Sequence, residues 1–191
     1  MRLFFVAICF ALSTLVFAGE AKELSKTVKV KMETNYGDII LELNQEKAPI
    51  TVSNFLKYTK NKFYEGTIFH RVINNFMIQG GGLTSDMQKK TTLPEIKNEA
   101  DNGLKNLVGT IAMARTNIVD SATSQFFINV NDNNFLNHRG KNPSEYGYTV
   151  FGKVIKGMTV VNRIKTVATT SKNGFQNVPT DPIIIKKVTR L

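Results

Sequence analysis

The sequence is poor in the residues that carry out most enzyme chemistry. Its 191 residues include one cysteine, two histidines and no tryptophan. Cys9 lies in an apolar N-terminal run, and without it the chain has no thiol for catalysis, redox chemistry or a disulfide. His70 and His138 have no nucleophilic partner nearby in the sequence, and neither an H-E-x-x-H nor an EF-hand pattern occurs. We therefore expect no metal and no cofactor, and we expect His70 to be a structural histidine with satisfied hydrogen bonds.

The N-terminus carries the one long apolar run of the sequence. It covers residues 3–17, follows a basic residue and ends in small or branched residues that suit a signal peptidase. A membrane span needs roughly 18 or more apolar residues, so we favour a signal peptide over a transmembrane anchor. We expect cleavage after Ala18, a polar lead-in over residues 19–27 and one domain over residues 28–191. No membrane contact is expected after cleavage.

Positive charge exceeds negative charge. The chain has 25 Lys and Arg against 15 Asp and Glu, a net charge of +10, which becomes +9 once Arg2 leaves with the signal peptide. Such a balance invites a nucleic-acid partner. However, the lysines are single or paired, as in Lys89-Lys90, and no basic run alternates with aromatic residues. We favour a solvated basic surface with no nucleic-acid partner, and we keep a polyanion binder as the weaker alternative.

The pattern of apolar residues indicates many short strands and two helices. Residues 28–34 and 39–43 alternate around a glycine, which predicts a β-hairpin. Helical spacing follows Pro49 over residues 50–60 and recurs over residues 158–164. Further short β-runs lie at residues 68–73, 76–79, 109–113, 126–130, 149–155 and 182–188. This pattern fits a barrel or a sandwich, and the period alone does not choose between them.

Two segments combine strand-like alternation with polar groups among apolar neighbours. They are residues 69–81, which include the basic Arg71, and residues 124–129. In a regular strand His70 and Arg71 face opposite ways, whereas residues two apart share a face. The run Gly80-Gly81-Gly82 lacks the Lys-Ser/Thr of a phosphate loop, so we expect a tight turn there. The pairs that share a face are Met77 with Gln79 and Gln125 with Phe127.

These segments resemble the cyclophilins, which are peptidyl-prolyl cis/trans isomerases, and the closest likeness is to the bacterial periplasmic type. The likeness runs from about Lys29 to Val188 and adds blocks at residues 109–114, 135–136 and 150–154. It implies a mainly β fold, a closed eight-stranded antiparallel barrel capped by two α-helices. It also implies a monomeric periplasmic enzyme without a cofactor, which accelerates rotation about X-Pro bonds in exported polypeptides.

The chemistry of this reaction needs neither a nucleophile nor a metal. Conjugation between the peptide nitrogen and the carbonyl sets a rotation barrier of about 18–20 kcal/mol. A cation near the prolyl nitrogen favours its deconjugated form. The resemblance makes Arg71 that catalytic cation, with a surface salt bridge as the alternative. It assigns substrate binding to ten residues, of which the apolar ones could also be core: Phe76, Met77, Gln79, Ala114, Arg115, Gln125, Phe127, Phe135, Leu136 and Tyr148.

Three positions depart from the best-known eukaryotic pattern. Phe135 stands in place of tryptophan, Tyr148 in place of histidine and Arg115 in place of asparagine. The tryptophan provides an indole donor to cyclosporin in that pattern, and Phe135 has none, so we expect weak cyclosporin binding with catalysis kept. The alternative function is a binding module or holdase of the same fold that grips proline-containing segments without useful turnover.

Overall fold

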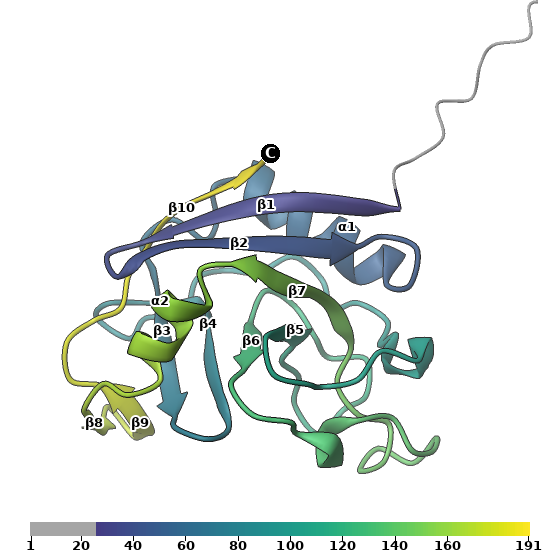
Figure 1. The fold of residues 1–191 in the computed structure, drawn as a ribbon. Coiled ribbons are helices and arrows are strands. Elements are labelled where there is room, and N and C mark those ends of the chain that lie inside the picture. Colours follow the sequence, from purple (N-terminus) through teal and green to yellow (C-terminus); the bar gives the residue numbers. More distant parts are fainter. Residues whose placement is uncertain (1–25) are drawn as a thin grey trace, which may run out of the picture.

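The computed structural model describes residues 26–191 (Figure 1). The predicted signal peptide and residues 19–25 of the predicted lead-in lie outside the described residues. Eight strands form one sheet in the order β10-β1-β2-β7-β5-β6-β4-β3, with antiparallel pairing between neighbours. Their bounds are β1 Thr27–Thr34, β2 Gly37–Asn44, β3 Thr67–Ile73, β4 Met77–Thr84, β5 Thr110–Met113, β6 Phe126–Asn129, β7 Val150–Lys156 and β10 Ile185–Arg190.

The sheet closes on itself between its first and last strands. Phe69 donates its backbone N–H to the Ile183 carbonyl at 2.9 Å, and Gly66 donates to the Ile185 carbonyl at 2.9 Å. These bonds join the β3 end of the sheet to the β10 end, which makes a nearly closed barrel. The predicted fold class is confirmed, and the sandwich is not what the chain forms. Within residues 26–191, no helix is long and apolar enough to cross a membrane.

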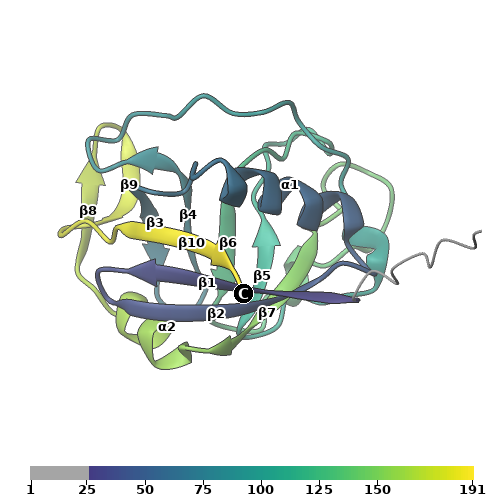
Figure 2. The same ribbon diagram turned by 90° about the horizontal axis from the view of Figure 1, so that it is seen from above.

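Two helices cover the barrel interior from opposite sides, as Figures 1 and 2 show for α1 (Pro49–Lys60) and α2 (Met158–Ile164). Both pack into one buried core, which we call the inner core. Its aromatic rings meet at tilted or edge-on angles, with 4.9 Å between the ring centroids of Phe55 and Tyr64 and 5.4 Å between those of Phe55 and Phe151. Such offset contacts are favourable between rings, so the interior is a filled core rather than a channel.

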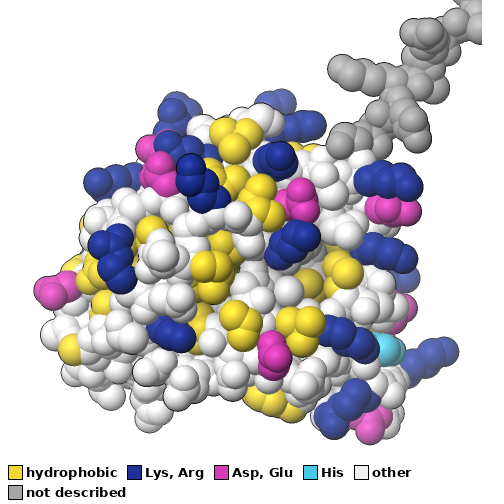
Figure 3. Space-filling model, in the orientation of Figure 1, with side chains coloured by type: hydrophobic (Ala, Val, Ile, Leu, Met, Phe, Trp, Pro, Cys, Tyr) yellow, Lys and Arg dark blue, Asp and Glu magenta, His cyan; other side chains and the backbone are white. Residues whose placement is uncertain are grey.

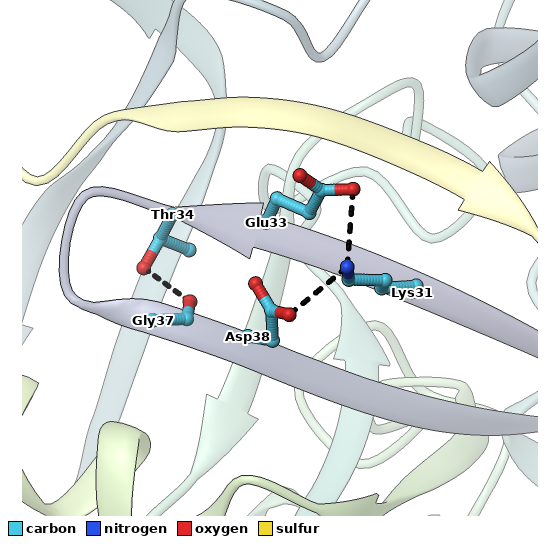
Figure 4. A network of polar contacts seen from close by, with 5 residues as sticks. All are labelled: Lys31, Glu33, Thr34, Gly37 and Asp38. Atoms are coloured by element: carbon cyan, nitrogen blue, oxygen red, sulfur yellow. Dashed lines mark hydrogen bonds and ion pairs between the residues drawn. The ribbon is translucent and has the colours of Figure 1, made fainter.

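The predicted β1–β2 hairpin is present and its turn is held by side chains (Figure 4). Gly37 has φ +125°, which a residue with a side chain rarely adopts. Thr34 donates its hydroxyl to the Gly37 carbonyl at 2.8 Å and accepts the Tyr36 N–H at 3.0 Å. Next to the turn, the Lys31 ammonium lies 3.0 Å from Asp38 and 3.3 Å from Glu33. Hydrogen bonds first to Asp38 and then to Glu33 raise the pKa of Lys31.

Helix α1 begins where Pro49 predicts, and a distant carboxylate satisfies its first turn. Proline suits this position because its missing N–H would have no partner there anyway. Glu99 accepts the backbone N–H groups of Ile50 at 3.0 Å and Thr51 at 2.8 Å, as well as the Thr51 hydroxyl at 2.7 Å. The carboxylate also suits the positive end of the helix dipole. The position of Glu99, 48 residues from Thr51, could not be read from local sequence.

One local expectation was wrong, and one small sheet was missed. The glycine run at residues 80–82 lies inside β4 and is not a tight turn; Gly81, with φ +81°, lets the strand bulge and continue. A second, two-stranded sheet of β8 (Thr169–Lys172) and β9 (Phe175–Pro179) was not predicted at all. Every residue of β8 is exposed, so no apolar alternation marks it as a strand.

Candidate active site

A second apolar cluster lies on the outer face of the barrel, and we call it the outer cluster. Its buried members are Met77, Ala112, Phe127, Leu136 and Val150. They come from β4, β5, β6, β7 and the 3-10 helix η2 (Asn134–Leu136). Several sequence neighbours of these residues belong to the inner core, because successive side chains of a strand point to opposite faces. The outer cluster is therefore an apolar surface with a solid core behind it.

A cavity of about 140 Å³ opens over the outer cluster. A single water needs only ~10–15 Å³ of such space, so the cavity has room for a small ring. Nine of the eleven residues expected at the site line it: Arg71, Phe76, Met77, Gln79, Ala114, Arg115, Phe127, Leu136 and Tyr148. The apolar residues among them line a cavity and so are more than interior core, the alternative left open by the sequence. Met77 and Phe127 are nevertheless buried. The structure brings together residues from positions 71 to 148 of the chain.

Arg71 is held at this cavity by a chain of amides. Its Nη1 donates to Gln79 Oε1 at 3.4 Å, and Gln79 Nε2 donates to Gln125 Oε1 at 2.9 Å. The guanidinium carbon lies 5.8 Å from the centroid of the Phe76 ring, within cation–π range. No carboxylate of residues 26–191 forms an ion pair with Arg71. Among the described residues, then, neutral amides direct the cation and no carboxylate compensates its charge, which argues against the salt-bridge alternative.

His70 and Arg71 lie on the same side of β3, contrary to the expectation for a regular strand. Phe69 pairs with Gly80 and Arg71 with Gln79, so His70 is an extra residue in β3 at this point. Such a bulge turns two successive side chains to one face. Both residues line a cavity of about 470 Å³, which Gln79 and Gln125 also line. Arg71 thus borders two cavities.

His70 is buried, but its hydrogen bonds are not all satisfied, contrary to expectation. The residue is 4% exposed, and its Nδ1 has no partner in the described part of the chain. The ring packs edge-on against Phe175, 6.4 Å between centroids. Burial first, and the neighbouring charge of Arg71 second, lower the pKa of His70 from 6.5 to about 4. The ring is therefore neutral near neutral pH, so Arg71 is the cationic member of the pair.

Arg115 is fixed by backbone carbonyls rather than left free for substrate. Its Nε donates to the Gly147 carbonyl at 2.9 Å and its Nη2 to the Pro143 carbonyl at 2.9 Å. Its guanidinium carbon lies 4.8 Å from the centroid of the Tyr148 ring. Arg115 therefore attaches the loop of residues 143–147 to the site and sets the position of Tyr148. The backbone N–H of Ala114, the residue that precedes Arg115, donates to the Gln125 carbonyl at 2.9 Å.

Two expected site residues lie outside the 140 Å³ cavity. Phe135 is 61% exposed and stacks on Phe76, with 5.6 Å between ring centroids, so it forms an outer rim. Gln125 lines a neighbouring cavity of about 150 Å³ that it shares with Gln79, Ala114 and Arg115. Three residues that sequence reasoning missed also line this cavity: Thr116, Ser121 and Thr123. Thr123 could have been predicted from the sequence, because it stands two residues before Gln125 and so shares its face in an extended chain.

Buried asparagines fix the rim from behind. Asn133 donates through Nδ2 to the Phe76 carbonyl at 2.8 Å and to Asn129 Oδ1 at 2.7 Å. Asn106 donates its backbone N–H to Asn137 Oδ1 at 2.7 Å and its Nδ2 to the Leu136 carbonyl at 3.2 Å. Because buried amides are costly when unpaired, this network specifies one position for η2. Among residues 26–191, no three His, Cys, Asp or Glu side chains are grouped to hold a metal.

Comparison with known families assigns the chain to a class. Residues 29–190 match the family described as cyclophilin type peptidyl-prolyl cis-trans isomerase/CLD. This match covers most of the chain, so the protein belongs to the cyclophilin-type peptidyl-prolyl cis-trans isomerases. The resemblance identified from sequence is confirmed, and so is the class of enzyme.

Individual relatives agree with this assignment. The chain is 59% identical over 157 residues to a peptidyl-prolyl cis-trans isomerase of Streptomyces antibioticus, covering 82% of this chain and 95% of that one. It is 55% identical over 160 residues to peptidyl-prolyl cis-trans isomerase B of Escherichia coli, covering 84% and 98%. A cyclophilin-type isomerase of Cryptosporidium parvum, crystallised in the presence of the dipeptide Ala-Pro, superposes with a TM-score of 0.69 at 29% identity, covering 84% and 96%.

Proposed function

We propose that this isomerase acts on X-Pro bonds of exported polypeptides and that Arg71 is its catalytic cation. The observation that carries the proposal is the position of the unpaired guanidinium, held by the Gln79 amide at the mouth of an apolar cavity. An X-Pro bond is the bond for which isomerisation is slow enough, at tens to hundreds of seconds, to limit folding. Acceleration of this step needs binding and electrostatics alone.

The site separates two tasks. The apolar floor of Met77, Phe127 and Leu136 would hold the prolyl ring by burial of its methylene groups. The guanidinium would face the prolyl nitrogen, whose lone pair becomes available only when the C–N bond twists out of conjugation. A charge that acts mainly on the twisted form stabilises the transition state more than it stabilises the bound planar peptide, so it lowers the rotation barrier. Arginine suits this role because it stays protonated at any ordinary pH.

The amides beside Arg71 would orient the peptide. Gln79 and Gln125 bind each other at 2.9 Å, and each retains capacity for a further hydrogen bond to a peptide backbone. Backbone recognition leaves most substrate side chains unread, so specificity should be broad beyond proline itself. The partners that fit are unfolded or extended proline-containing polypeptides. An exported location rests on the apolar run at residues 3–17, and a monomer in the periplasm is the form we propose.

The decisive experiment measures cis-to-trans isomerisation of an Ala-Pro tetrapeptide by the mature chain, for wild type, Arg71→Ala and Arg71→Lys. We expect Arg71→Ala to lower kcat/KM by about 10²–10³-fold, the loss typical of one electrostatic donor at a transition state. Arg71→Lys should retain part of the wild-type kcat/KM, because lysine keeps the positive charge but lacks the planar guanidinium group. Circular dichroism should show all three folded, because Arg71 is only half-buried.

Two outcomes would decide against the proposal. A folded wild type without acceleration would favour the alternative, a proline-peptide-binding module or holdase of this fold. Acceleration that survives in Arg71→Ala would keep the isomerase but remove Arg71 as its catalytic group. The exported role has its own test: periplasmic fractionation of cells that express the full chain, where a purely cytoplasmic protein would contradict it.

A further inference from the structure

A second groove lies between helix α1 and strand β10, and it shares no lining residue with the cavities of the candidate site. It has a volume of about 580 Å³. Residues of helix α1, of the loop after it and of β10 line most of it. The isomerase chemistry makes no use of this groove.

The groove is strongly cationic. Five exposed basic residues line it against one carboxylate, that of Glu65. None of the five forms an ion pair with any of residues 26–191. Figure 3 shows Lys and Arg side chains spread over the face that it presents, several of them along its upper edge. Like charges so close together repel, and an anionic partner would relieve the repulsion. The five are Lys57, Lys60, Lys62, Lys187 and Arg190.

The groove also runs along a strand edge. Four consecutive residues of β10, residues 187–190, line it. A groove over one face of a sheet would contact alternate residues only, so this one meets the side of the strand. β10 pairs with β1 along its other edge, and Gly66 bonds to Ile185 at the start of β10. Beyond that bond, no strand of the described chain pairs with the groove edge of β10.

We propose that the groove binds an acidic, extended polypeptide segment, which adds a strand to β10 and sets its carboxylates against the basic residues. Open strand edges offer backbone donors and acceptors to an added strand. The half-buried side chain of Leu56 at the groove offers such a peptide an apolar contact. A nucleic acid fits less well, because the groove contains no aromatic side chain on which a base could stack.

The test is fluorescence anisotropy with a labelled, proline-free peptide that alternates Glu with Val, titrated with the chain cleaved after residue 18. Wild type should bind with an affinity that falls steeply with salt. Lys187→Gln/Arg190→Gln should weaken binding about tenfold, since each exposed charge contact contributes up to ~1 kcal/mol. Lys141→Gln/Lys172→Gln removes equal charge outside the groove and should bind as wild type does. All variants should keep wild-type isomerase activity, which shows that they are folded.

Two further probes test the occupant. A peptide with N-methyl groups on alternate backbone nitrogens should lose affinity, because it cannot pair as a strand on its blocked edge. A single-stranded oligothymidylate of equal charge should bind more weakly than the Glu-Val peptide. The proposal is overturned if wild type does not bind the peptide, if both charge variants weaken binding equally, if N-methylation has no effect, or if the oligonucleotide binds more tightly than the peptide.

Discussion

The two faces of strands β4, β5, β6 and β7 carry apolar residues with different surroundings. On each strand one residue faces the inner core and its sequence neighbour joins the outer cluster. The inner residues belong to the core that also holds the packed aromatic rings and both helices, whereas two of the outer ones, Met77 and Phe127, border a cavity with Arg71 and Gln79. The inner and outer pairs are Ile78 with Met77, Ile111 with Ala112, Phe126 with Phe127, and Phe151 with Val150.

Burial does not distinguish the two faces, because all eight of these residues are at most 4% exposed. What differs is the freedom to admit a ligand. The inner core is filled, so its side chains fix the barrel, while the outer cluster leaves a cavity beside a cation. The same strands therefore provide a stable core on one face and a binding site on the other. Substitutions on the inner face should mainly lower stability, and substitutions on the outer face should mainly lower activity.

The largest contrast is expected at Phe126 and Phe127. The Phe126 ring lies 5.6–5.9 Å from the rings of Phe55, Tyr64 and Phe69, so Phe126→Ala should cost about 3–5 kcal/mol of unfolding free energy. Phe127→Ala extends a cavity that is already open, so it should cost less stability but lower kcat/KM by about 10²-fold through loss of proline positioning. Urea unfolding and the tetrapeptide assay measure both. Equal destabilisation with unchanged turnover in Phe127→Ala would remove the distinction.

The next effect is the pH dependence of stability due to His70. In the folded chain the pKa of His70 is about 4, below the ordinary 6.5. Between these two values the unfolded chain binds a proton on His70 and the folded chain does not. The contribution of neutral His70 to the free energy of unfolding is therefore complete above pH 6.5. It should decrease as pH falls toward 4, by about 3 kcal/mol in all. Urea unfolding between pH 4 and 7 measures it. His70→Gln should flatten this slope; an unchanged slope would assign it to other groups.

A smaller contrast is expected between Gly81 and Gly82. A Cβ on Gly81 would lie 2.6 Å from the Phe126 ring, and φ is +81°, so Gly81→Ala should cost about 1–3 kcal/mol of stability. A Cβ on Gly82 would lie 2.5 Å from Cγ of Gln125, a flexible side chain on the outer face. Gly82→Ala should therefore displace Gln125 and lower kcat/KM with less loss of stability. If Gly82→Ala is as unstable as Gly81→Ala and fully active when folded, Gln125 does not orient substrate.

The smallest effect on the fold is expected at the exposed rim. Phe135→Trp adds an indole donor to a ring that is 61% exposed, so the midpoint of urea unfolding should not change. Cyclosporin binding, which we expect to be weak in wild type, should tighten by up to about tenfold, the contribution of one good hydrogen bond. Isothermal titration measures the change. A wild type that already binds as tightly as the variant would show that the rim donor is unimportant.

Local signals in the sequence predicted most of the helices and strands, whereas the closed barrel was predicted from the family resemblance. Proline at position 49 marked the start of α1, and glycine at position 37 marked the hairpin turn. The β8 strand gave no signal because its side chains are polar and all exposed. The bulge at His70 also gave none, because it arises from the register between β3 and β4 and not from the residues of β3 alone.

The candidate site was predicted from the family resemblance more than from the residues themselves. Phe126 and Phe127 are identical in type, so the sequence could not show which faces the inner core. Arg115 was expected to bind substrate, and the hydrogen bonds by which its side chain holds the loop at residues 143–147 were not predicted. Thr116 and Ser121 reach the site only because their loop folds back, with 2.8 Å between the two hydroxyls. Such long-range placement leaves no local pattern.

The pairing of β1 with β10 has a consequence for how this chain acquires its structure. The register places Val30 opposite Arg190. Strand β1 therefore has one partner, β2, next to it in the sequence and the other, β10, at the C-terminal end of the domain. Contacts between such distant segments slow folding, because a long loop must be ordered before they form. A chain that emerges N-terminus first can make the β1–β2 hairpin at once, but it cannot complete the barrel until residues 185–190 are free to join.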